Sequence, residues 1–240
     1  MKLIDKLLNG SKTIVFLDFE GTQISQEIIA IGAVKVTLDK KNNIKKILPG
    51  FKCFVKSKDK VGKIITKLTG ITDVLLSEEG LLFKEAIIRL EKYCRADANT
   101  KYVSYGNFDM RLLHQSATIN NLNDDKFIRS IYKNYFDFSA LLIRYVQGKK
   151  GGQLSLLDAL KTFGIQPEGN AHDPLFDAKN LALLYQGFLQ NHSKLVDEYY
   201  KVLTNNSRLP HPIGKTISTL NKNGTVTKKE FIKFIEEDLY

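Results

Sequence analysis

The sequence contains little cysteine and no long apolar run. Its 240 residues include two cysteines, Cys53 and Cys94, which lie far apart and form no C-x-x-C pair, and only four histidines. Structural zinc sites need clustered cysteine and histidine ligands, so we expect none here. The scarcity of cysteine also favours a reducing, cytoplasmic compartment. No apolar stretch approaches the length of a membrane span, so no membrane association is expected.

A secretion signal, internal repeats and low-complexity tracts are also lacking. Residues 1–9 form a short amphipathic stretch with an acidic residue, Asp5, and lack the long apolar core and cleavage site of a signal peptide. The 43% hydrophobic and 10% aromatic content is typical of a soluble globular protein rather than a disordered one. The length predicts one substantial domain plus an extension.

Acidic residues are outnumbered by basic ones. The chain has 36 basic and 26 acidic residues, for a net charge of +10. Between Lys35 and Lys67 eleven lysines stand against two acids, Asp39 and Asp59. Such a patch attracts polyanions, nucleic acid above all. The alternative is a hydrated hairpin surface that lysine keeps soluble. Because lysine outnumbers arginine, the pattern favours contacts to a nucleic-acid backbone over base-specific recognition.

The residues from Thr13 to Thr22 predict a short buried strand that ends in two acids. Five apolar residues, β-branched or aromatic in the main, precede Asp18, and Glu20 follows two positions later. Side chains alternate along a strand, so both carboxylates leave on one face. Two neighbouring anions repel each other, and a bound hard cation such as Mg²⁺ removes that cost. The alternative is that the strand ends in solvent and both acids are hydrated.

The hydrophobic pattern of the next 170 or so residues predicts an α/β layered domain with a mixed sheet. Hairpin signals make the first strands antiparallel. We expect strands at 13–20, 26–37, 44–55 (interrupted at Pro49-Gly50) and 101–106, and helices at 64–68, 79–94, 110–117, 136–146, 154–163 and 173–188.

A more polar, helical tail begins near Asn191, with an irregular segment predicted at 205–215. Residues 219–230 invite comparison with a calcium-binding EF loop, because Gly224 and Glu230 occupy its sixth and twelfth positions. The first position is threonine, however. We therefore favour a turn at 223–224 and a helix opened by a capping box of Thr227 and Glu230.

Two further acids and a histidine lie where elements are expected to meet. Asp109 follows a predicted strand at the start of a helix, and Asp177 lies one turn inside the helix opened by Asp173 and Pro174. His172 directly precedes that opening. Taken singly, these three could be a first-turn acid, a surface acid and a turn histidine. In α/β sheets, however, ligands gather where strand ends and helix starts meet.

In order, the motifs D-x-E at a strand end, G-N-x-D and H-x-x-x-x-D resemble those of the DEDDh 3′–5′ exonucleases of the ribonuclease H-like superfold. Segments 27–34, 68–72 and 177–182 are similar to the surroundings of that family's motifs. The resemblance covers roughly residues 12–190. It implies a three-layer α/β exonuclease domain at 1–190, with a mixed central sheet of about five strands flanked by helices, and a C-terminal helical extension at 191–240.

The resemblance also implies a site and a reaction. Two Mg²⁺ or Mn²⁺ ions would grip the scissile phosphate of a single-stranded nucleic acid with a free 3′ end, and nucleoside 5′-monophosphates would be released one at a time. The implied metal ligands are Asp18, Glu20, Asp109 and Asp177, the catalytic residues are Glu20 and the general base His172, and the residues holding the terminal nucleotide are Gly21, Thr22, Asn107 and Phe108. Protein partners are not predicted.

The first motif, D-F-E-x-T, is closer to the exoribonuclease branch than to the D-x-E-T-T-G of the proofreading branch, and this favours RNA. Three alternatives stay open: a DNA-directed proofreading or repair exonuclease, a non-catalytic nucleic-acid-binding module, and a nucleotidyl transferase. The last has no need of His172, and the sequence contains no glycine-rich phosphate loop.

Overall fold

The structure is a computed structural model that describes residues 2–95, 97, 99–204 and 209–239. The chain forms two compact units. The first comprises Met1–Leu141 and Leu154–Asn191, and the second comprises Leu142–Gln153 and His192–Tyr240. The predicted site residues all belong to the first unit.

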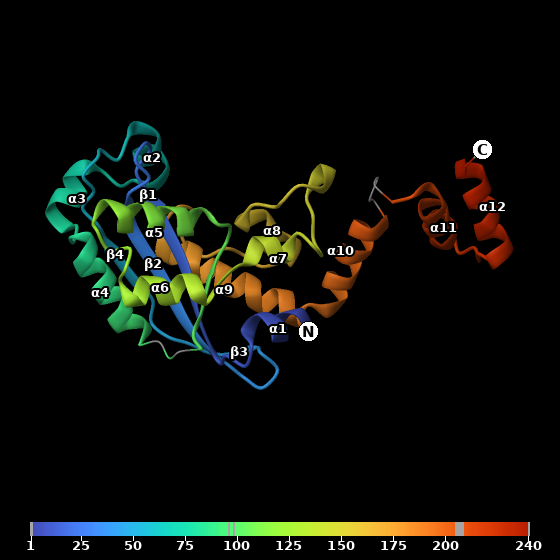
Figure 1. Cartoon of the computed structure of the whole chain (residues 1–240), viewed down its shortest axis with the longest axis horizontal. Helices are drawn as coiled ribbons and strands as arrows, with labels where there is room; N and C mark the ends of the chain where they lie inside the picture. The colour runs from blue at the N-terminus through green and yellow to red at the C-terminus, as the bar shows by residue number, and fades with distance from the viewer. Residues whose placement is uncertain (1, 96, 98, 205–208, 240) are drawn as a thin grey trace. The chain divides into compact units, whose positions relative to one another are not determined.

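A six-stranded mixed sheet forms the centre of the first unit (Figure 1). Its strands are β1 (Thr13–Gly21), β2 (Ile28–Leu38), β3 (Ile44–Ile47), β4 (Phe51–Phe54), β5 (Lys101–Ser104) and β6 (Tyr135–Asp137). The order is β3-β2-β1-β5-β6, and β4 also pairs with β2. The first hairpins are antiparallel, as the turn signals predict, whereas β5 and β6 continue the sheet in parallel to β1.

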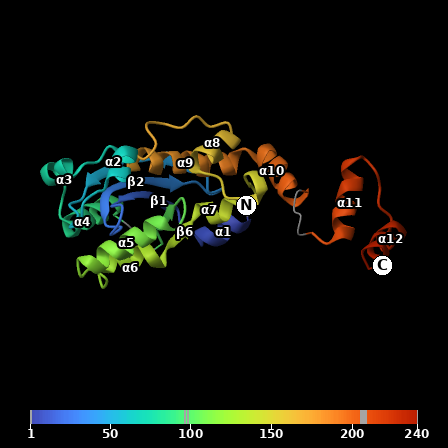
Figure 2. The same cartoon turned by 90° about the horizontal axis from the view of Figure 1, so that it is seen from above.

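Helices cover both faces of this sheet (Figure 2). The odd-numbered residues of β1, such as Leu17 and Phe19, pack against α4 (Phe83–Cys94), α5 (Phe108–Ile119) and α6 (Lys126–Lys133). The even-numbered residues face α9 (Pro174–Gln190), where the ring of Phe16 contacts that of Tyr185. Burial of these apolar faces holds the layers together. The predicted three-layer α/β fold is therefore confirmed, with six strands rather than about five.

The remaining helices complete the two units. The first unit contains α1 (Lys2–Leu8), α2 (Lys63–Thr69), α3 (Asp73–Glu79) and α8 (Leu156–Thr162), and α7 (Phe138–Leu142) ends at its boundary. The second unit contains a 3₁₀ turn (Lys149–Gly151), α10 (His192–Thr204), α11 (His211–Asn221) and α12 (Lys228–Leu239). Of the helices described, none has both the length and the apolar character needed to cross a membrane.

The interruption predicted at Pro49-Gly50 is confirmed, and it separates β3 from β4 within the stretch 44–55. Other predicted boundaries are wrong. The helix predicted at 79–94 starts only at Phe83, and α3 precedes it with Thr72 as its N-cap, the hydroxyl of which accepts from Leu75 N–H. The run at 136–146 begins as strand β6, since its first residues pair with β5, and continues as the short α7.

Helix α6 was not predicted, although the sequence carries its signal. Asp125 caps the helix by accepting hydrogen bonds from the N–H groups of Phe127 and Ile128 (2.9 and 3.0 Å). Phe127, Ile128 and Ile131 are then buried at helical spacing. An N-cap acid followed by this apolar pattern is therefore sufficient to predict the element.

The tail contains helices where an irregular segment was predicted. Positions 205–208 lie outside the described residues, and from His211 the chain is helical, so the irregular assignment is wrong for 211–215. The turn at 223–224 is confirmed, since Asn223 has φ 59° and Gly224 N–H donates to Thr219 C=O (3.0 Å). The capping box is also confirmed, because Thr227 N–H donates to Glu230 Oε2 (2.8 Å).

A glycine lets α9 sit directly on the sheet. Gly32 in β2 is the cross-strand neighbour of Asp18 in β1. A Cβ atom at Gly32 would lie 2.0 Å from the carbonyl oxygen of Pro174, the first residue of α9. No side chain fits between strand and helix at this point. The N-terminus of α9 therefore reaches the strand pair just beside Asp18.

We predict that Gly32→Ala destabilises the protein by about 1–3 kcal/mol, because the backbone of α9 must move away. The matched control is Gly214→Ala in α11, where an added Cβ meets nothing within 4 Å. It should stabilise its helix by up to about 1 kcal/mol. Urea denaturation measures both changes. A Gly32→Ala protein as stable as the wild type would contradict the close approach.

Candidate functional site

Asp18 and Glu20 lie at the carboxyl end of β1, on the face that α9 covers. This agrees with the alternation predicted from the sequence. The register between β1 and β2 shifts between Glu20 and Gly21, so a bulge follows the second acid. Bulges bend a strand and redirect its side chains. The two carboxylates therefore leave the sheet together at an irregular strand end.

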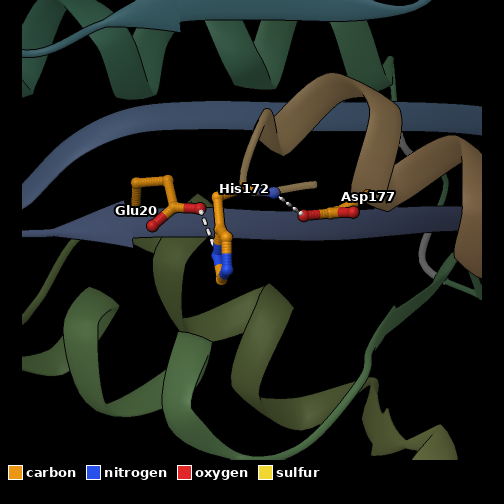
Figure 3. Close-up of side chains that lie close together, drawn as sticks. All are labelled: Glu20, His172 and Asp177. Atoms are coloured by element: carbon orange, nitrogen blue, oxygen red, sulfur yellow. Dashed lines mark hydrogen bonds and ion pairs between the residues drawn. The ribbon is translucent and has the colours of Figure 1, made fainter. Parts of the chain in front are cut away.

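His172 and Asp177 approach Glu20 from the loop and first turn at the start of α9 (Figure 3). Asp173 caps the helix by accepting from Leu175 N–H (3.0 Å), as predicted. His172 N–H donates to Asp177 Oδ2 (2.8 Å), and its Nδ1 lies 3.9 Å from Glu20 Oε1. Ligand atoms of Glu20, His172 and Asp177 all lie within 4.8 Å of one another. Residues more than 150 positions apart thus share one site.

Asp109 approaches from α5, in the opposite layer. Its carboxylate is buried and accepts a hydrogen bond from Phe19 N–H (2.7 Å). Parallel pairing of β1 with β5 ends at Phe16 and Val103, so the β1 backbone beyond has no strand partner on that edge. Asp109 takes the place of the missing strand, and its charge lies close enough to act on both Asp18 and Glu20.

The loop before α9 is anchored at two points, Glu168 and Gly169, which hold the chain that leads to His172. Asn180 is buried, and its amide accepts from Glu168 N–H (2.8 Å) and donates to Glu168 C=O (3.0 Å). Gly169 has φ 64°, and an added Cβ there would collide with the ring of Phe176. His172 itself has φ 64°, an uncommon value for a residue with a side chain.

Burial raises the pKa of all four carboxyl groups, those of Asp18, Glu20, Asp109 and Asp177. Burial raises the pKa of Glu20 to about 8, and the charges of Asp177 and Asp109 add to the rise. Burial, followed by the same two charges, holds the pKa of Asp18 well above its usual range. Burial raises the pKa of Asp109 to about 7 and also raises that of Asp177, although backbone hydrogen bonds oppose both shifts.

The donor set fits a divalent cation. Among the described residues, no lysine or arginine forms an ion pair with these four carboxylates. The neighbouring Lys52 is paired with Asp173 instead (2.8 Å). Carboxylate oxygens are the preferred ligands of hard ions such as Mg²⁺ and Mn²⁺. A bound cation would remove both the repulsion and the cost of burying the charges.

The four candidate substrate contacts lie at two places next to the acids, the end of β1 and the start of α5. Phe108 is 44% exposed, and the guanidinium of Arg111 lies 5.0 Å from the centre of its ring. Asn107 is exposed, and its side chain does not cap α5. Gly21 and Thr22 are buried, and the Thr22 hydroxyl accepts from Glu27 N–H (3.0 Å). Phe108 and Asn107 thus offer free side chains, whereas Thr22 shapes its loop.

Sequence reasoning missed residues that position the site. Asn180 lies three residues after Asp177. Its signal in the sequence was that it is a polar residue within the apolar face of α9. Asp137, at the end of β6, accepts from Gly106 N–H (2.9 Å) and so fixes the turn before α5. Asp137 also accepts from the N–H groups of Ser139 and Ala140 at the start of α7, so its local signal was that of a helix-capping acid. Its contact with Gly106, by contrast, spans 31 positions.

The sequence and the fold of the first unit both resemble those of known proteins. The sequence model of the exonuclease family matches residues 15–185. The structure is similar to the nuclease domain of 3′hExo, a DEDDh family member, bound to rAMP, with 19% identity over 76% of this chain and 94% of that chain and a TM-score of 0.61. It is also similar to E. coli exonuclease I in complex with a dT13 oligonucleotide, with 18% identity over 81% of this chain and 44% of that chain and a TM-score of 0.59. No curated protein sequence matches.

The raised pKa values predict how the stability of the metal-free protein depends on pH. Burial raises the pKa of Glu20 from 4.5 to about 8, so the folded state holds this proton more tightly than the unfolded state. The free energy of unfolding should therefore fall as the pH rises through that interval, and Asp18 and Asp109 act in the same direction. Glu20→Gln should reduce the fall and be more stable than the wild type at the alkaline end.

Urea denaturation in EDTA, at the two ends of the interval, measures this effect. Glu91→Gln on the exposed side of α4 is the control and should leave the pH dependence as it is in the wild type. If Glu20→Gln lost stability at alkaline pH relative to the wild type, the crowding of negative charge would be contradicted.

Proposed function

The chain belongs to the exonuclease family, and we propose that it is a DEDDh-type 3′–5′ exonuclease that hydrolyses single-stranded nucleic acid, RNA in preference to DNA. It would start at the free 3′ end and release nucleoside 5′-monophosphates. The observation that carries the proposal is the convergence of Asp18, Glu20, Asp109, Asp177 and His172 on one end of β1. The acids are too crowded to be charged together without a cation.

The four carboxylates of Asp18, Glu20, Asp109 and Asp177 would hold two Mg²⁺ or Mn²⁺ ions. When bound, such ions acidify a water molecule, neutralise the scissile phosphate and stabilise the departing 3′ oxygen. Asp18 and Glu20 approach from the strand, and Asp109 and Asp177 from helices in the two outer layers. The ligands are therefore carried by a strand and two helices, which fix the relative positions of the carboxylates.

His172 would act as the general base that takes the proton of the attacking water. Its ring is about half exposed, so substrate and solvent can reach it. Its backbone N–H is bonded to Asp177, which ties the base to a proposed metal ligand. Histidine titrates near neutrality, as a base working at neutral pH requires. Glu20, 3.9 Å from Nδ1, would orient the ring as well as bind metal.

Residues beside the acids would hold the terminal nucleotide. We assign Phe108 to stacking against the base, because its ring is exposed directly next to Asp109. Asn107 would hydrogen-bond to the same nucleotide. The turn that begins with Gly21 and Thr22 would form the opposite wall.

The preference for RNA rests on the wording D-F-E-x-T at Asp18 to Thr22 and is supported by the similarity to 3′hExo, which was crystallised with rAMP. The alternative is DNA, because exonuclease I, bound to a dT13 oligonucleotide, has a comparable TM-score. Turnover of RNA and DNA of one sequence, in parallel, decides between them. A higher kcat/KM for DNA would overturn the preference, which must arise from contact with the 2′-OH.

We also propose that residues 1–190 form the exonuclease domain and 191–240 a helical extension. The compact units divide near the same point, at Asn191, although Leu142–Gln153 groups with the extension. Cytoplasmic location is part of the proposal. It rests on Cys53 and Cys94, which are both free thiols.

Asp18→Ala should abolish hydrolysis with little loss of folding, because the removal of one crowded anion relieves repulsion. The assay is stepwise shortening of a 5′-labelled RNA in Mg²⁺, with EDTA as the blank. Asp124→Ala, in which an exposed acid is removed, is the control and should retain wild-type turnover. Undiminished activity of a folded Asp18→Ala protein would refute the assignment.

His172→Ala should lower kcat by roughly 10²–10⁴-fold, as expected for the loss of a general base, while Mn²⁺ binding changes little. His114→Ala, at an exposed position of α5, is the matched control. Turnover and Mn²⁺ titration are measured on the same samples. If His172→Ala bound Mn²⁺ as poorly as Asp18→Ala does, the residue would be a metal ligand rather than the base.

A further inference from the structure

The fold divides the lysine-rich segment of the sequence into two separate places. Register between β1 and β2 pairs Thr13 with Thr37 and Glu20 with Ala30. The turn from β2 to β3 therefore lies near the start of β1, away from the carboxylates. The chain beyond β4 returns to the other end of β1, where the carboxylates lie. Figure 1 shows β3 and α2 at opposite ends of the sheet. We call Lys40, Lys41 and Lys45 the hairpin lysines, and Lys60, Lys63 and Lys67 the α2 lysines.

The α2 segment is bonded directly to the turn that follows the catalytic acids. Gln23, three residues after Glu20, donates its N–H to Val61 C=O (3.0 Å). Its side-chain oxygen accepts from Ile64 N–H in α2 (3.2 Å). A Cβ atom at Gly62 would lie 2.6 Å from that of Gln23, so the two backbones are in close contact. The α2 lysines are therefore attached to one wall of the proposed substrate site.

A buried carboxylate makes this connection rigid. Glu27, at 4% exposure, accepts hydrogen bonds from the N–H groups of Lys58 and Asp59 (2.9 and 3.0 Å) and from the Ser25 hydroxyl (3.0 Å). Because backbone donors satisfy this acid, it does not neutralise the lysines around it. The Lys58 ammonium in turn donates to Ile119 C=O at the end of α5 (2.8 Å).

The α2 lysines are exposed, and within the part of the chain that the structure describes their ammonium groups form neither ion pairs nor hydrogen bonds. Lys52, by contrast, is paired with Asp173. Lys63 and Lys67 are one helical turn apart, about 6 Å along the axis, and share a face. Unpaired cations beside an acidic site therefore suit a polyanion whose end enters that site.

We propose that Lys60, Lys63 and Lys67 bind the phosphates of the substrate strand on the 5′ side of the scissile nucleotide. This inference rests on the proposed exonuclease function and adds the path of the strand. Lysine is a point charge without the planar geometry that reads bases. The α2 lysines therefore contribute affinity that does not depend on sequence or on the sugar, and the distinction between RNA and DNA arises at the terminal nucleotide.

The proposed path of the substrate strand is tested by a binding assay. A 5′-labelled single strand with hydrolysis-resistant phosphorothioate linkages is bound in Mg²⁺ at a series of salt concentrations. For the Lys60→Ala, Lys63→Ala, Lys67→Ala triple variant, the slope of log K against log salt should become shallower by about 2. Affinity should fall roughly tenfold at low salt, by the same factor for RNA and DNA. The Lys→Arg triple variant at these positions should retain the wild-type slope, as should the triple alanine variant of the hairpin lysines.

The proposed path of the strand would be overturned if the alanine variant of the α2 lysines kept the wild-type salt slope. It would also be overturned if the alanine variant of the hairpin lysines lost as much slope and affinity as the α2 variant. Turnover of the unmodified strand is measured separately. If the wild type hydrolyses the strand but the α2 variant keeps the wild-type salt slope, only the proposed path of the strand is overturned. If the α2 variant has a shallower slope but the wild type hydrolyses nothing, only the exonuclease assignment is overturned. Wild-type protein that fails to bind the strand would overturn both.

Discussion

Mutual repulsion among four carboxylates at the end of β1 is the constraint on which the site depends. Asp18, Glu20, Asp109 and Asp177 come from three layers of the fold. Burial raises the pKa of all four, and the charges of the other acids add to the rise at Asp18 and Glu20. Buried carboxylates without a compensating positive charge destabilise a fold. Without metal, bound protons relieve the repulsion up to about neutral pH, and divalent cations would relieve it by displacing those protons. The same feature therefore explains both a stability cost and a catalytic function.

The remainder of the first unit holds these groups together against that repulsion. Gly32 allows the start of α9 to rest on the strand pair, and Asn180 fixes the loop that carries His172. Phe19 N–H holds Asp109 where strand pairing has ended. These supports are backbone contacts and backbone hydrogen bonds, which resist displacement better than long side chains do. A rigid arrangement of this kind can receive cations without reorganisation.

Much of the site was predictable because its chemistry is local in sequence. The strand before Asp18 and the cap before Asp177 are short patterns with a direct physical meaning, and their order carries the family resemblance. Long-range pairing limited the remaining predictions. Strand β6 consists of three residues that are extended only because β5 lies alongside. The two groups of lysines form one run in the sequence, and only the register of β1 with β2 separates them.

Proton release on metal binding tests the central claim most directly. Mn²⁺ is titrated into the metal-free protein by calorimetry at about pH 7, in two buffers of different ionisation enthalpy. The pKa values of Glu20 and Asp109, about 8 and about 7, predict that protons are released as the metal binds. The release from Glu20 and Asp109 should be much smaller at about pH 9, where these two acids are largely ionised. Binding without proton release at neutral pH, or no binding of Mn²⁺, would contradict the account.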